Sequence, residues 1–250
     1  MESGDLPCGF QTRMMHRTLE NLASMYAFHF VGDSTTRRLA ESFVSIVTGK
    51  ASAHEYYHAR RNLTIGELQV NFHWAPFCEA SVRQPGVGVG LEEVLDDQEQ
   101  ENRLAGGRRA VIITAFGVWD AVHGTGDEDA LNACSDVVTN LTHVAQLPAT
   151  VDNTAVSTDA SPPMVFLLQN NPFLADSEED HFLSDLHNIQ RQVIETSGEG
   201  ELYLVRDRDS IYERMSCFRM GESIHFMDPV KLVEAKMLWD LIALVAGVAV

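Results

Sequence analysis

Ser34 has the clearest capacity for chemistry, because of its place in Gly32-Asp33-Ser34-Thr35-Thr36-Arg37. Apolar and aromatic residues precede this segment, and residues with helical spacing follow it. A serine at a strand-to-helix turn has its hydroxyl raised above the sheet edge, beside N–H groups that can hold a developing oxyanion. The pattern predicts a nucleophile for acyl transfer. The alternative is that Asp33 or Ser34 only caps the helix, which is the commoner use of an isolated Gly-Asp-Ser.

A serine nucleophile needs a general base, and the base needs an acid that orients it. Glu222 precedes His225 by three residues, in a loop that leads into a helix from Pro229. A turn of that length can present both side chains to one site. Taken alone, His225 is better explained as a packing or capping histidine, whereas its pairing with the serine turn favours a catalytic role.

Two further strand ends carry residues that could bind a substrate or its oxyanion. Gly117 follows an apolar run, and its N–H could be offered to the oxyanion. Trp119 could form an aromatic wall against a sugar ring, and Asn170 ends the next apolar run. A glycine turn with a core tryptophan explains Gly117 and Trp119 about equally well.

The elements that must position these residues alternate between strands and helices. Continuous apolar runs predict buried strands, apolar residues that alternate with polar ones predict the strand at 65–74, and apolar residues three and four apart predict helices. Strands are expected at 26–31, 65–74, 110–115, 164–169 and 202–205, and helices at 35–47, 127–147, 176–196 and from Pro229. This alternation predicts a single α/β domain over residues 1–250, with three layers and a mainly parallel sheet. Ligands bind such sheets at the carboxyl ends of the strands, where Ser34, Gly117 and Asn170 would emerge.

Three short blocks resemble the SGNH/GDSL hydrolase superfamily. The first is Gly32-Asp33-Ser34, with Arg37 at the offset seen in its PC-esterase branch, which includes trichome-birefringence-type and sialic-acid O-acetyltransferases. Gly117-Val-Trp-Asp120 is similar to the third block, and Glu222-Ser-Ile-His225 to the last. The resemblance implies an SGNH-like fold, with Ser34 as nucleophile, His225 as base and Glu222 as the orienting acid.

The same resemblance implies the groups around the triad. The amides of Ser34 and Gly117 would bind the oxyanion, and Arg37 and Trp119 would contact the substrate. The sequence departs from the family in two places: Glu222 replaces the usual aspartate, and Trp119 stands where the superfamily has its oxyanion asparagine. Asn170, or its neighbour Asn171, could supply that missing donor.

We therefore expect an acyl-ester enzyme that hydrolyses or transfers an acetyl or similar group on a small-molecule or glycan ester. Hydrolysis requires no cofactor, whereas transfer requires an acyl donor such as acetyl-CoA. A catalytically weak or inactive glycan-binding domain is the alternative that the two departures favour. The net charge of −18 argues against nucleic acid as a partner.

A zinc hydrolase is a further alternative, because His54-Glu55-Tyr56-Tyr57-His58 matches H-E-x-x-H. The segment lacks the apolar face of a buried helix, and only Glu79 could be suggested as a distant third ligand. A polar surface segment is the better interpretation, and we expect no metal.

The compartment stays open at this stage. The chain has four cysteines, Cys8, Cys78, Cys134 and Cys217, and none of them forms a C-x-x-C pair. This spacing excludes finger-type metal clusters, and the cysteines could form disulfides or be buried thiols. Sequons at Asn62 and Asn140 favour the secretory pathway, although residues 1–17 do not resemble a signal peptide. The apolar residues 237–250 predict a core-packed helix, and are also consistent with a fragment of a membrane-anchored parent.

Overall fold

The computed structural model describes nine segments of the chain. They are residues 16–48, 61–63, 66–79, 107–123, 128–146, 161–170, 178–197, 200–205 and 228–248. Every structural statement below concerns these residues.

Six described strands form one sheet in the order β2-β3-β1-β4-β5-β6. They are β1 (Tyr26–Gly32), β2 (Arg61–Asn62), β3 (Gln69–Trp74), β4 (Arg109–Ala115), β5 (Met164–Leu168) and β6 (Leu202–Val205). All neighbouring pairs are parallel except β2 with β3. The expected α/β class with a mainly parallel sheet is therefore confirmed.

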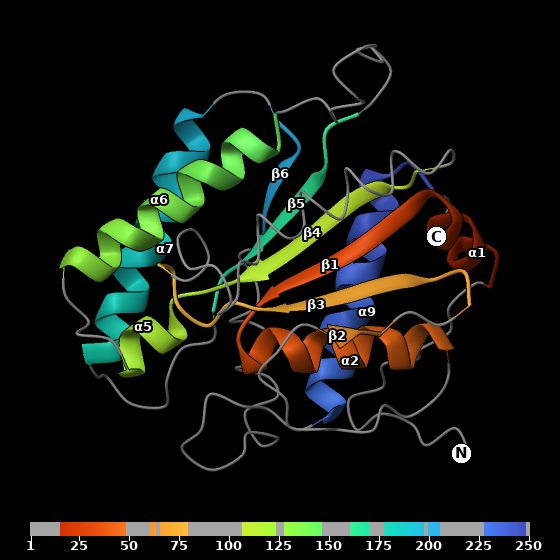
Figure 1. Cartoon of the computed structure of the whole chain (residues 1–250), viewed down its shortest axis with the longest axis horizontal. Coiled ribbons are helices and arrows are strands. Elements are labelled where there is room, and N and C mark those ends of the chain that lie inside the picture. Colours follow the sequence, from red (N-terminus) through yellow and green to blue (C-terminus); the bar gives the residue numbers. More distant parts are fainter. Residues whose placement is uncertain are drawn as a thin grey trace.

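Helices cover both faces of this sheet (Figure 1). The described helices are α1 (His16–Met25), α2 (Ser34–Thr48), α5 (Val118–His123), α6 (Glu128–Val144), α7 (Glu178–Thr196) and α9 (Asp228–Val245). None of them is long and apolar enough to cross a membrane.

Successive side chains along the central strands point to opposite faces of the sheet, so each face has its own hydrophobic core. Phe28 and Phe30 of β1 pack with Phe43 of α2 and Trp239 of α9. Val31 belongs to the opposite core, which α6 and α7 complete. Because both faces are covered, the central strands read as continuous apolar runs, which explains why the sequence marks them clearly.

Most element bounds agree with the sequence-based expectations to within three residues. The strand expected at 65–74 begins only at Gln69, after a turn at Gly66. Helices α1 and α5 and strand β2 were not expected.

Candidate active site at the carboxyl ends of β1, β4 and β5

The turn between β1 and α2 places Ser34 at the first residue of a 15-residue helix. Asp33, not Ser34, caps that helix. Its Oδ1 accepts hydrogen bonds from the Thr35 amide at 2.8 Å, the Thr35 hydroxyl at 2.7 Å and the Thr36 amide at 3.3 Å. Helix capping therefore explains why Asp33 stands in this turn, and it does not explain why Ser34 does.

Gly32 allows the chain to turn sharply at this point. Its φ is +152°, and an added Cβ would lie 2.5 Å from both the Ala115 carbonyl oxygen and the Thr36 hydroxyl. Because the Ala115 oxygen belongs to the backbone of β4, a side chain at position 32 would fit only if β4 shifted. The serine turn is thus pressed against the end of the neighbouring strand.

Parallel register brings the predicted oxyanion residues to the same sheet edge. Gly32 pairs with Ala115 at the end of β4, and Thr114 of β4 pairs with Leu167 of β5. Gly117 and Asn170 each follow their strand by two residues. Ser34, Gly117 and Asn170 therefore do emerge at the carboxyl ends of neighbouring strands, as expected.

Asn170 is tied to the turn that contains Gly117. Its side-chain amide donates a short hydrogen bond to the Phe116 carbonyl, and the residue is 2% exposed. That carbonyl and the Gly117 N–H belong to one planar peptide group. Asn170 consequently fixes the orientation of the N–H that was predicted to face an oxyanion.

Gly117 has a φ of +99° and lies against α7, where an added Cβ would be 2.3 Å from Leu186 Cδ2. Its carbonyl accepts the first hydrogen bond of α5, from the Ala121 amide at 2.9 Å. The positive φ and the close packing both require glycine at this position.

Trp119 lies in an aromatic cluster beside this turn. Its ring centroid is 5.6 Å from that of Trp74, 5.7 Å from that of Phe77 and 4.7 Å from that of His123. Trp119 is partly buried and His123 is exposed. Arg37, also predicted to contact substrate, lies one turn after Ser34 and is only 5% exposed.

Asp120 is, with Asp33, a buried acid of this region, at 5% exposure. Both carboxylate oxygens accept the Cys78 amide, at 3.2 Å each. Burial raises the pKa of Asp120 from 3.8 to about 6, against the lowering effect of hydrogen bonds from the Cys78 amide and its own. The negative charges of Asp33 and Glu79 raise this pKa further.

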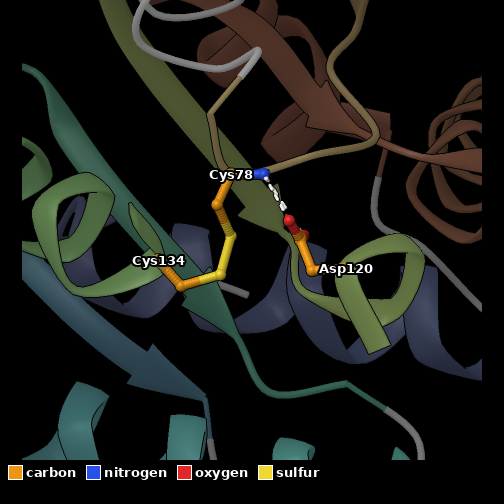
Figure 2. A group of neighbouring side chains, drawn as sticks. All are labelled: Cys78, Asp120 and Cys134. Atoms are coloured by element: carbon orange, nitrogen blue, oxygen red, sulfur yellow. Dashed lines mark hydrogen bonds between the residues drawn. A yellow bond between two sulfur atoms is a disulfide. The ribbon is translucent and has the colours of Figure 1, made fainter. Parts of the chain in front are cut away.

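Cys78 and Cys134 form a disulfide next to Asp120 (Figure 2). The carboxylate and the two sulfur atoms lie within 4.8 Å of one another. Since the sulfur atoms are bonded to each other, they offer no thiolates to a metal ion. Of the two states left open for these cysteines, the structure has the disulfide.

The remaining predicted site residues lie outside the described parts of the chain. They are the triad residues Glu222 and His225, Asn171, the zinc-motif residues His54, Glu55 and His58, and the cysteines Cys8 and Cys217. Glu79, the suggested third zinc ligand, is described and exposed.

Sequence reasoning gave no role to Asp120 or to the Cys78–Cys134 pair. The one indication of a role for Asp120 was its position at the end of the Gly117-Val-Trp-Asp120 block. Cysteines 56 positions apart carry no pairing signal by themselves.

No family model and no curated protein matches the chain.

Proposed function

We propose that the protein is a serine-dependent enzyme that hydrolyses or transfers an acetyl or similar acyl group through an acyl-enzyme on Ser34. One observation carries the proposal: Ser34 opens α2 at the carboxyl end of a central strand, while Asp33 serves as the helix cap. The resemblance to the SGNH/GDSL superfamily, in its PC-esterase branch, supports the same conclusion.

The reaction has two steps. Ser34 Oγ attacks the ester carbonyl carbon while His225, oriented by Glu222, takes the hydroxyl proton. The tetrahedral intermediate expels the alcohol, which receives that proton, and an acyl-serine ester remains. Water or an acceptor hydroxyl then attacks this ester, and the serine regains its proton through His225.

Backbone amides stabilise the negative charge of each intermediate. The Ser34 N–H lies at the start of α2, and the Gly117 N–H belongs to the peptide that Asn170 holds by its carbonyl. Asn170 supports these donors by holding the Phe116 carbonyl, which points away from the N–H of the same trans peptide and so orients that N–H.

The substrate class is an ester on a carbohydrate. An aromatic ring at the site edge suits a sugar face, and Trp119 is partly exposed there. Arg37 would contact the substrate through the small part of its side chain that is open. Hydrolysis needs no cofactor, and transfer needs an acyl donor such as acetyl-CoA.

A non-catalytic glycan-binding domain of the same fold is the second candidate. The observation in its favour is that the Asn170 amide is engaged with the Phe116 carbonyl, so that it is only in part available to an oxyanion.

Turnover of an aryl acetate by the wild-type protein and by Ser34→Ala tests the proposal. We expect Ser34→Ala to lose at least about 10³-fold in kcat. Ser45→Ala is the matched control, since Ser45 lies on the same helix and its hydroxyl donates to the Glu41 carbonyl of that helix. Equal turnover by wild type and Ser34→Ala would rule out the serine mechanism, and absence of wild-type turnover would favour the binding domain.

A further inference from the structure

Residues 75–78, which we call the bridging segment, contact both turns of the proposed oxyanion site. The Ala75 amide donates to the Gly32 carbonyl at 3.0 Å, next to the serine turn. The Cys78 amide donates to Asp120, three residues after Gly117. One short segment therefore spans from the Ser34 turn to the Gly117 turn.

The far end of the bridging segment is anchored in the core. Cys78 is fully buried and joined to Cys134 of α6 by the disulfide. Figure 2 shows Cys78 between its two partners, with the sulfur toward α6 and the amide toward Asp120. Asp120 thus ties α5 to a segment that is itself covalently fixed.

We propose that Asp120 is a positioning residue of the acyl-transfer site. By holding the Cys78 amide, its carboxylate fixes the separation between the Ser34 and Gly117 amides that bind the oxyanion. This inference rests on the proposed function. Oxyanion donors act only at hydrogen-bond distance, so a small displacement of one turn lowers the rate of the chemical step.

The charge on Asp120 matters because an ionised carboxylate accepts a stronger hydrogen bond than a neutral acid or amide. The groups described around it are the Cys78 amide, the acids Asp33 and Glu79, and a disulfide that does not titrate. With a pKa of about 6, Asp120 loses its charge as the pH falls through that value.

Kinetics of aryl acetate turnover from about pH 5 to 8 test the proposal, with Asp120→Asn as the variant. Asp120→Asn carries a neutral side chain at every pH, and we expect its kcat to be about tenfold below that of wild type above about pH 7, with KM within about twofold. Protonation of Asp120 should bring wild type down to the same level, so the ratio of wild-type to variant kcat should fall toward one as the pH falls through about 6. Asp129→Asn, the same change at an exposed acid of α6, should behave as wild type.

Other outcomes overturn the inference. An unchanged kcat in Asp120→Asn contradicts it, and so does a lower kcat whose ratio to wild type stays constant from about pH 5 to 8, which indicates a merely structural role. If Asp120→Asn does not fold, the wild-type profile decides, since an acid limb no steeper than a slope of about one contradicts the inference. Wild-type activity that survives in Ser34→Ala, or no activity at all, defeats the proposed function itself and is thereby distinguished from failure of this inference alone.

Discussion

At the scale of single residues, the site is defined by two buried acids with different roles. Asp33 uses one oxygen to cap the nucleophile helix, and Asp120 uses both oxygens to hold the Cys78 amide. The negative charge of Asp33 adds to the cost of charging Asp120, because like charges repel in a poorly solvated region.

Loss of the Asp33 cap should weaken α2. Asp33→Ala removes three hydrogen bonds from the start of the helix, and we expect about 1–2 kcal/mol of destabilisation in urea unfolding. Asp33→Asn keeps an acceptor oxygen and should lose clearly less. Equal losses in the two variants would contradict the assignment of Asp33 as the cap.

The raised pKa of Asp120 predicts how stability depends on pH. The folded state holds the proton up to about pH 6 and the unfolded state only to about 3.8, so ionisation between these values destabilises the fold. The asparagine variant avoids that cost. From pH 4 to 7, the free energy of unfolding of Asp120→Asn should rise relative to wild type by up to about 3 kcal/mol.

Urea unfolding at both pH values measures this difference. If the difference in free energy of unfolding between wild type and Asp120→Asn were the same at both pH values, the Asp120 pKa would not be raised in the folded protein.

The sequence identified Ser34 and its neighbours because their motif is local. It could not reveal the burial of Asp120 or the partner of Cys78, because these depend on contacts between residues 42 and 56 positions apart. Glu222 and His225 remain predictions.

At the scale of elements, strands that are buried on both faces were found from sequence, whereas α1, β2 and α5 were not. β4 and β5 are almost continuous apolar runs. α5 has only six residues, too few for helical periodicity, and its first turn reads as a glycine turn with a tryptophan. α1 does have Leu19, Leu22 and Ala23 at helical spacing, a signal that the sequence-based expectations did not use.

Among the glycines that the structure describes, Gly117 in the turn into α5 should be the most sensitive to substitution after Gly32. Gly117→Ala must accept a φ of +99° and crowd Leu186, so we expect a loss of about 2–5 kcal/mol in stability from strain and overpacking together. Gly66→Ala is the control, because Gly66 has a φ of +61° but open space around it. Equal losses at the two positions, measured by thermal unfolding, would argue against tight packing on α7.

At the scale of the whole molecule, the Cys78–Cys134 disulfide joins the segment after β3 to α6, which packs on one face of the sheet. A disulfide in this position favours an oxidising compartment for the folded protein.

Removal of this disulfide should destabilise the fold. The bridge closes a loop with a sequence separation of 56, for which the chain-entropy model gives about 4 kcal/mol. We expect Cys78→Ala/Cys134→Ala to lose stability of that order in urea unfolding under oxidising conditions. Addition of a dithiol reductant is the control, since it should lower the stability of wild type toward that of the variant. Equal stability of the variant and the oxidised wild type would contradict the presence of the Cys78–Cys134 disulfide.

The central claim, that Ser34 is an activated nucleophile, is tested most directly by a fluorophosphonate probe followed by peptide mass analysis. The account predicts one covalent adduct on Ser34 in the folded protein, and none in Ser34→Ala or after denaturation. No adduct on the folded protein, or an adduct confined to another residue, would contradict it.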